Sequence, residues 1–152
     1  MPKIALDDLP VLTGTGYPQP YAALVKGRSR RALGDAVGLT QFGVNLVRLE
    51  PGAASSQRHW HENEDEFLIV LEGELILVDE SGDTPMRPGD CAGFKAGDPN
   101  GHHLVNRSDR PGVFLVVGTR AAVERAHYPD IDMLYVQDEN GGRFTRRSGE
   151  PY

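Results

Sequence analysis

The sequence predicts an all-β protein, either a sandwich or a barrel. Short runs rich in β-branched and aromatic residues recur along the chain, and glycine (18 residues) and proline (11 residues) separate them at close intervals. No long helical period competes with these runs. At 152 residues the chain has the length of one domain and can bury a core without disulfides.

Six runs are expected to form strands, because each combines β-favouring apolar residues with turn signals at its ends. In chain order they are residues 42–49, 66–73, 74–80, 90–94, 102–107 and 113–118. The turns between them contain glycine or proline: Pro51-Gly52, Gly73, Ser81-Gly82-Asp83, Pro88-Gly89, Gly97 to Gly101, and Pro111-Gly112. Beyond the last run, residues 120–127 are interpreted as one or two helical turns, so little helix is expected.

The barrel core is therefore predicted over residues 42–118, with a segment on each side. Residues 1–41 have no clear period, and we expect an extended arm that packs on the barrel or on a partner subunit. Residues 119–152 are expected to form a carboxy-terminal extension. The basic run KGRSRR at 26–31 lacks interleaved aromatic residues, so it is interpreted as a solvated segment before the core.

Charge and composition argue against two classes of partner. A net charge of −6 disfavours binding to nucleic acid or anionic lipid. No apolar segment approaches the roughly 18 residues of a membrane span. The first residues lack a signal-peptide pattern, and the single cysteine, Cys91, is interpreted as buried and inert. A cytoplasmic protein that binds neither nucleic acid nor membrane is expected.

The sequence HWH at 59–61 places two histidines on one face of a strand, because side chains at i and i+2 point the same way. The polar residues 62–65 are interpreted as a turn with solvated acids, after which Glu66 opens the next strand and can rejoin His59 and His61. A second cluster, GHH at 101–103, enters another strand. Together they offer histidines and a carboxylate, a ligand set for a divalent transition metal.

Two alternatives accompany this interpretation. An isolated HxH pattern is more often a pair of solvated or hydrogen-bonded histidines than a metal site, although here four of the five histidines fall in the two clusters. His127 is the fifth, interpreted as a surface or packing residue. Within GHH, His102 and His103 face opposite sides of a strand, so only one can point inward. His102 is favoured, but a register shift by one residue would exchange them.

These residues carry a resemblance to the cupin superfamily. The segment GAASSQRHWHENEDEFLIVLEG resembles the first cupin motif, with matches at Gly52, His59, His61, Glu66 and Gly73. The segment GDCAGFKAGDPNGHHLVN resembles the second motif, with matches at Gly89, Gly97, His102 and Asn106. Lys95 stands where the family usually has proline, and the turn from Gly97 to His102 is longer than the common form. The whole chain is similar to small single-domain bacterial cupins, a mostly uncharacterised group described in part as sugar-phosphate isomerase-like.

The resemblance implies a jelly-roll barrel, also called a double-stranded β-helix, and a homodimer. It implies one divalent metal per chain (Mn, Fe, Ni, Co or Zn), held by His59, His61, Glu66 and His102. Such a ligand set leaves positions free on an octahedral metal, as in an enzyme. We therefore expect a metalloenzyme acting on a small molecule.

The metal would act as a Lewis acid in isomerase or lyase chemistry on a sugar phosphate or a hydroxy- or keto-acid, or would bind dioxygen. No catalytic residue is assigned. The alternative is a non-catalytic ligand-binding or sensory module, because the same barrel hosts several functions.

Overall fold

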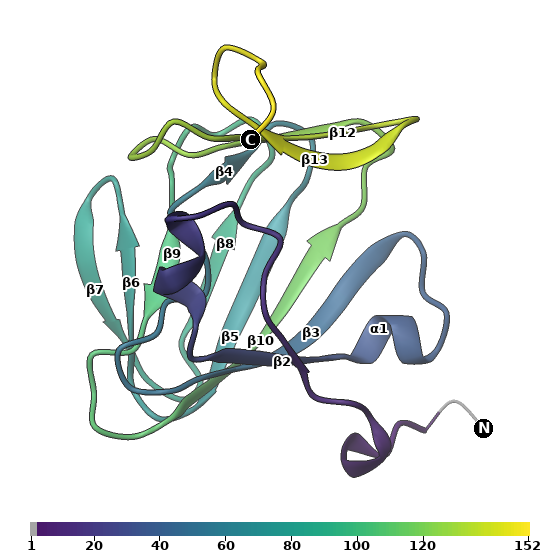
Figure 1. The fold of residues 1–152 in the computed structure, drawn as a ribbon. Helices are drawn as coiled ribbons and strands as arrows, with labels where there is room; N and C mark the ends of the chain where they lie inside the picture. Colours follow the sequence, from purple (N-terminus) through teal and green to yellow (C-terminus); the bar gives the residue numbers. More distant parts are fainter. Residues whose placement is uncertain (1–2) are drawn as a thin grey trace.

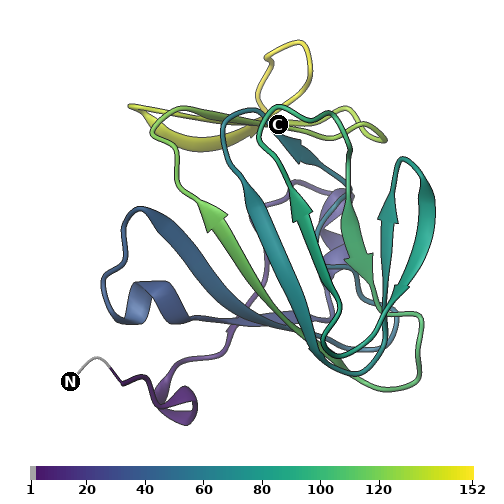
Figure 2. The same cartoon turned by 180° about the vertical axis from the view of Figure 1, so that it is seen from behind.

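The computed structural model describes residues 3–152, which form antiparallel sheets around a main hydrophobic core, with a second, smaller cluster around Ala126, Tyr128 and Met133 (Figure 1). The six-stranded sheet has the order β1 (Leu12–Thr13), β2 (Arg28–Ala32), β3 (Phe42–Leu49), β10 (Gly112–Thr119), β5 (Glu66–Glu72), β8 (Cys91–Phe94). Facing it is a three-stranded sheet of β7 (Gly82–Met86), β6 (Leu75–Asp79) and β9 (His103–Val105). A four-stranded sheet crosses one end, seen at the top of Figures 1 and 2: β13 (Gly141–Thr145), β12 (Leu134–Asp138), β11 (Glu124–His127), β4 (Trp60–His61). The fold is thus the predicted all-β jelly roll.

Helix is confined to short pieces, as expected. They are the 3-10 helices η1 (Leu6–Asp8) and η2 (Tyr21–Val25) and the α-helix α1 (Leu33–Ala36). Within residues 3–152, no helix is both long and apolar enough to cross a membrane.

The core lies between the six-stranded and three-stranded sheets, and strand alternation decides which residues enter it. On β5, Leu68 and Val70 are 4% and 0% exposed, whereas Phe67 and Leu71, which point the other way, are 47% and 43% exposed. Strand β10 pairs with β3 and β5, which places Phe114 beside Val70 on the inner face. All six strands predicted from sequence are present, so the periodicity of the apolar residues was a sufficient signal for them.

Three sequence-based expectations about strands and the core are wrong. Residues 124–127 form strand β11 instead of helical turns, because this backbone pairs with β12 and β4. The run KGRSRR is not a solvated segment, since Arg28–Ala32 forms β2 and pairs along β3 with most of its residues half-buried. Cys91 is exposed, because it points away from the core on β8, whereas Ala92 and Phe94 pack against the core.

Candidate metal centre

The structure brings together all four residues that the sequence predicted as ligands. Nε2 of His59 lies 3.1 Å from Nε2 of His61, and Nε2 of His102 lies 2.7 Å from Oε2 of Glu66. The rings of His59 and His102 have centroids 5.1 Å apart. Ligand atoms of His59, His61 and Glu66 all lie within 4.8 Å of one another, a spacing that can hold a metal ion.

A β-bridge joins the two histidine clusters. The backbone N–H of His102 donates to the carbonyl of His59 at 2.9 Å, and the N–H of His59 donates to the carbonyl of His102 at 3.2 Å. Residues opposed in this way share a face of the sheet. The bridge therefore sets the imidazoles of His59 and His102 side by side, although the two histidines are far apart in the sequence.

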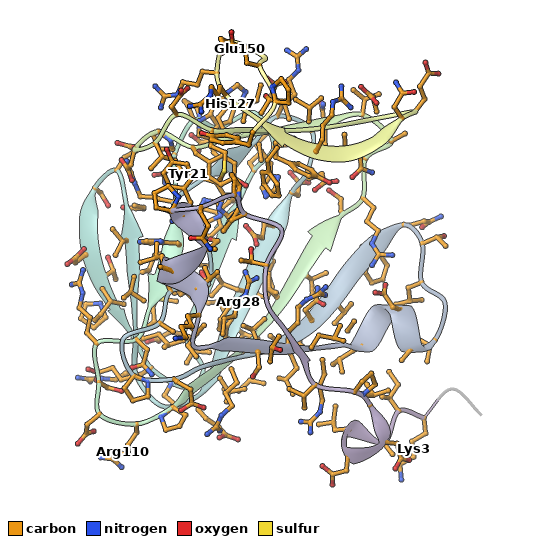
Figure 3. The ribbon with its side chains drawn as sticks, viewed as in Figure 1. Lys3, Tyr21, Arg28, Arg110, His127 and Glu150 are labelled. Atoms are coloured by element: carbon orange, nitrogen blue, oxygen red, sulfur yellow. The ribbon has the colours of Figure 1, made fainter. Side chains whose placement is uncertain are left out.

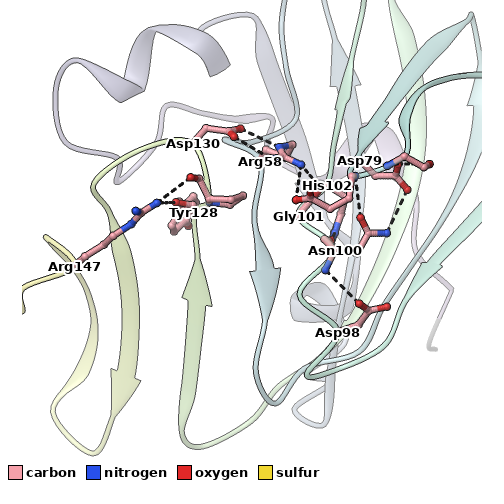
Figure 4. A network of polar contacts seen from close by, with 12 residues as sticks. Arg58, Asp79, Asp98, Asn100, Gly101, His102, Tyr128, Asp130 and Arg147 are labelled. Carbon is pink, nitrogen blue, oxygen red and sulfur yellow. Dashed lines mark hydrogen bonds and ion pairs between the residues drawn. The ribbon is translucent and has the colours of Figure 1, made fainter.

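The long turn before His102 is held by a polar network, which fixes its register (Figure 4). Arg58 donates to the carbonyl of Gly101 at 3.1 Å and to both carboxylate oxygens of Asp130 at 2.8 and 2.9 Å. The side chain of Asn100 donates to Asp79 at 3.2 Å. A Cβ at Gly101 would lie 2.8 Å from Cγ of Pro129, so glycine permits this close approach.

With that register, the ring of His102 faces Glu66 and the ring of His103 does not. His102 is 3% exposed and its ring stacks on Phe94, with centroids 3.4 Å apart and planes at 3°. Nδ1 of His103 lies instead 2.8 Å from the carbonyl oxygen of Ser56. The geometry therefore follows the favoured register of the sequence analysis.

In His59 and His102, hydrogen bonds to backbone carbonyls indicate which ring nitrogen carries the proton of the neutral ring. Nδ1 of His59 lies 2.9 Å from the carbonyl oxygen of Gln57, and Nδ1 of His102 lies 3.1 Å from that of Asn100. A carbonyl only accepts, so Nδ1 carries the proton in both neutral rings and Nε2 is left as an acceptor. In His102 this acceptor faces the carboxylate of Glu66, another acceptor. Such a contact requires a shared proton or a cation.

The residues fit a divalent cation on these grounds. Three imidazoles and one carboxylate are a donor set suited to a transition metal. Among the residues the structure describes, buried Nδ1 of His61 has no hydrogen-bond partner, and the nearest carboxylate oxygen, Oε2 of Glu64, is 3.8 Å away. A weakly held ring of this kind can turn its Nε2 toward a metal.

The protonation states also suit metal binding, which needs neutral imidazole and ionised carboxylate. Burial lowers the pKa of His59 to about 4. The charge of Glu66 acts in the opposite direction and raises this pKa, whereas His61 and His102 lower it further. Burial by itself would raise the pKa of Glu66, but the hydrogen bond with His102 and the charge of His59 outweigh it and lower that pKa to about 2. At neutral pH the centre therefore presents the carboxylate of Glu66 beside the neutral ring of His59.

The centre is accessible from two sides. One pocket, of about 270 Å³, is lined by His59, Glu66 and His102 and also by His103, Arg28 and Arg30. This volume is near the lower end of small-molecule sites, roughly 300 Å³. A second pocket is lined by His61, Glu64 and Glu66. A small ligand could thus approach the ring nitrogens and the carboxylate.

Sequence reasoning missed the residue that fixes the turn at 62–65. Glu124, on β11, is 1% exposed, and its carboxylate accepts hydrogen bonds from the backbone N–H groups of Glu62 at 2.9 Å and Asn63 at 3.1 Å. This turn sets the distance between His61 and Glu66. The only signal was the alternation of Glu124 with Ala126, which has meaning once residues 124–127 are known to be a strand.

The acids of this turn make specific contacts, whereas the sequence predicted solvated side chains. Oε1 of Glu62 lies 2.7 Å from Nε2 of His127, whose ring stacks on Trp60. Glu64 accepts a hydrogen bond from the backbone N–H of Ala121 at 2.9 Å. The turn is thus tied to the four-stranded sheet at several points.

Comparisons with known proteins bear on the family and the fold of this chain. The cupin domain family model matches residues 45–118. A solved structure of a cupin-superfamily sugar phosphate isomerase from Silicibacter pomeroyi is 57% identical, with a TM-score of 0.95, over 99% of this chain and 96% of that chain. A protein from Acidithiobacillus ferrooxidans, proposed to be a sugar phosphate isomerase, is 30% identical, with a TM-score of 0.74, over 82% of this chain and 80% of that chain.

The fold also recurs in the polyketide cyclase RemF from Streptomyces resistomycificus. That chain is 22% identical, with a TM-score of 0.63, over 78% of this chain and 79% of that chain. At this identity the likeness concerns the fold alone. The search of curated proteins gave no significant match.

Proposed function

From the premise that this chain belongs to the cupin superfamily, we propose that it is a divalent-metal-dependent isomerase acting on a small sugar phosphate or a related hydroxy- or keto-compound. His59, His61, Glu66 and His102 would hold the metal. When bound, the metal supplies Lewis acidity toward a carbonyl or hydroxyl oxygen of the substrate. Two relatives, at 57% and 30% identity, have names that refer to sugar phosphate isomerase, and these names support this reaction class.

One observation carries the metal-binding part of this proposal. The backbone carbonyls of Gln57 and Asn100 fix the tautomers of His59 and His102, so that both rings present a lone pair beside the carboxylate of Glu66. A protonated His102 could form the same 2.7 Å contact by donating Nε2–H to Glu66, and the metal analysis below distinguishes the two states. A divalent cation held by these side chains would offset the carboxylate charge and use the lone pairs of the imidazoles.

Isomerisation also needs a group that removes and returns a proton, and we propose His103 for this role. It lines the same pocket as His59, Glu66 and His102. Its Nδ1 is hydrogen-bonded to the carbonyl of Ser56, so Nε2 of the neutral ring is free to accept a proton.

Metal analysis on two matched variants tests the first part. Purified protein should contain about one divalent metal per chain, and metal-stripped protein should gain melting temperature with at least one of Mn, Fe, Ni, Co or Zn. Glu66→Ala should lose most of the metal, whereas Glu72→Ala, an exposed position at the other end of β5, should retain it. Absence of metal binding by the stripped wild-type protein would overturn the proposal.

A proton-exchange assay tests the second part. Sugar phosphates and hydroxy- or keto-acids are incubated with metal-loaded protein in D₂O, and deuterium incorporation next to the carbonyl is followed by NMR. Isomerase chemistry predicts incorporation that depends on the metal and on His103. Oxygen consumption with these substrates would favour dioxygenase chemistry, and tight binding without exchange would favour a binding module.

We also propose that the outer face of the six-stranded sheet pairs two copies of the chain, as the family resemblance implied. This face exposes large apolar side chains, with Phe42, Phe67 and Leu71 exposed at 38%, 47% and 43%. Light scattering after gel filtration measures the mass directly. Phe67→Glu should convert a dimer to a monomer, and a monomeric wild-type protein would contradict the proposal.

A further inference from the structure

The basic run KGRSRR enters the barrel as strand β2, and this gives two of its arginines a common direction. Arg28 pairs with Leu49 and Arg30 with Val47 on β3, residues that are 0% and 5% exposed in the core. Opposed residues of an antiparallel pair lie on the same face of the sheet. Arg28 and Arg30 therefore point to the inner side of the sheet, and Figure 3 labels Arg28 on the side of β2 toward the four-stranded sheet.

Both arginines line the pocket that also contains His59, Glu66 and His102. Arg28 is half-buried and donates to the carbonyl oxygens of Ser55 at 2.7 Å and Gly14 at 3.2 Å. Arg30 is exposed and donates to Oδ1 of Asn45 at 2.8 Å. A guanidinium carries more N–H donors than these contacts use. Each arginine thus keeps N–H donors that can bind a ligand. Arg28 is the more buried of the two, and Arg30 is the more exposed to solvent.

Neither arginine has a carboxylate partner within residues 3–152, which sets them apart from most arginines of this protein. Of the described residues that line the pocket, only Glu66 is acidic, and it is engaged with His102. Burial lowers the pKa of Arg28, and the positive charge of Arg30 adds to this shift. Two positive charges are therefore left without compensation beside the proposed metal centre.

We propose that Arg28 and Arg30 bind the anionic group of the substrate, a phosphate or a carboxylate, while the oxygen atoms that react reach the histidine and glutamate cluster. The proposal rests on the proposed function, because it names the part of the substrate that the metal does not contact. A guanidinium fork matches the oxygens of phosphate and carboxylate, and such charge-assisted hydrogen bonds are the stronger ones in proteins.

The small pocket is consistent with a substrate that has its anionic group a few bonds away from the reacting carbon. Arg28, Arg30 and the cluster line one cavity of about 270 Å³, which leaves room for a compact molecule only. A substrate of this kind would be held at both ends, which orients its carbonyl for reaction. A neutral sugar would lack one of these two attachments.

Binding of inorganic phosphate and of malonate, measured by calorimetry, tests the proposal without relying on activity. Arg28→Gln and Arg30→Gln are compared with Arg31→Gln, a matched control on the same strand that does not line this pocket. The first two variants should bind the preferred anion at least about tenfold more weakly, since each loses charge-assisted hydrogen bonds. The Arg31→Gln protein should bind like the wild type. The anion with the higher affinity identifies the group as phosphate or carboxylate.

Metal content, measured on the same samples, separates this inference from the proposed function. Arg28→Gln and Arg30→Gln should retain the wild-type metal content. If metal binds normally but both variants bind both anions like the wild type, the arginine assignment is wrong and the metalloenzyme proposal stands. If stripped wild-type protein binds no metal yet binds phosphate or malonate through these arginines, the arginine assignment stands and the metalloenzyme proposal falls.

Arg30→Gln should fold like the wild-type protein, because Arg30 is exposed and its side chain hydrogen-bonds only to Asn45. Asn45→Ala removes the same contact and keeps the guanidinium. It should therefore bind the anion more tightly than Arg30→Gln does. Equal loss in these two variants, or no measurable binding of either anion by the wild-type protein, would overturn the proposal.

Discussion

Nε2 of His102 lies 2.7 Å from Oε2 of Glu66, while Nδ1 of the same ring lies 3.1 Å from the backbone carbonyl of Asn100. One imidazole thus joins the polar turn at residues 97–102 to the first residue of β5. The relationship also separates His102 from its neighbour His103, whose ring is bound to Ser56. The two adjacent histidines should therefore have different functions.

Replacing the two histidines in turn tests that difference. His102→Ala should weaken metal binding by at least about 100-fold, because even the loss of a partner outside the ligand set costs 10–100-fold. His103→Ala should keep near-normal metal content and lose deuterium exchange. Elemental analysis of both purified variants is the measurement. Full retention of metal by His102→Ala together with loss in His103→Ala would reverse the assignment.

The stability of metal-stripped protein should fall as the pH drops from about 6.5 to about 4. Burial lowers the pKa of His59 from 6.5 to about 4, so in this range the unfolded chain binds a proton that the folded chain does not. The stability from this group is present above pH 6.5 and is lost on acidification, by about 3 kcal/mol. The measurement is urea unfolding at a series of pH values.

His59→Gln serves as the control for this pH dependence. The variant should be less stable overall, but its stability should change less between pH 6.5 and pH 4 because the titrating ring is gone. His103, whose pKa burial also lowers, would account for part of the remaining slope. Glu66 titrates in a lower range, since its pKa in the folded protein is about 2. An unchanged slope in His59→Gln would show that His59 titrates normally.

The grouping of His59, His61 and Glu66 could be predicted from sequence because its geometry is local, whereas the family resemblance was needed to add His102. A period of two places His59 and His61 together, and a polar turn returns Glu66 to them. The two arginines of the pocket could not be assigned in this way. Their direction depends on the pairing of Arg28 with Leu49 and Arg30 with Val47, a contact between segments about twenty residues apart that a charge pattern does not reveal.

The same physical reason explains the error at residues 120–127. The alanine-rich sequence there has helical propensity, but the pairing of Ala126 with His61 and of His127 with Trp60 outweighs it. Because these partners lie about sixty residues earlier, local composition carries no information about them. The six central strands, by contrast, show their apolar alternation within each segment.

Glu124 should be important for stability despite lying outside the proposed ligand set. Glu124→Leu leaves the N–H groups of Glu62 and Asn63 without their acceptor, and a buried unpaired donor costs about 1–3 kcal/mol. Glu124→Gln keeps one acceptor oxygen and should cost less. Urea unfolding of both variants is the measurement, with the exposed Glu139→Ala as a control. Equal stability of Glu124→Leu and wild type would contradict this role.

The glycine that ends the first cupin motif should tolerate no side chain. Gly73 has φ of 74°, and a Cβ there would lie 2.5 Å from the carbonyl oxygen of Pro111, a backbone atom that cannot rotate away. Gly52, which begins the motif, also has positive φ, at 86°, but nothing lies within 4 Å of its Cβ position. Gly52→Ala should therefore cost only the left-handed backbone strain, about 1–2 kcal/mol.

Gly73→Ala should cost more than Gly52→Ala, because the chain must also move Pro111 and Gly112 away from the new methyl group. That movement disturbs the start of β10, the strand that pairs with both β3 and β5. We expect a total loss of about 3–5 kcal/mol, the range of the largest single-site effects. Chemical denaturation of the two variants in parallel gives both values. Equal destabilisation would mean that backbone strain alone accounts for glycine at residue 73 and that the contact with Pro111 relaxes freely.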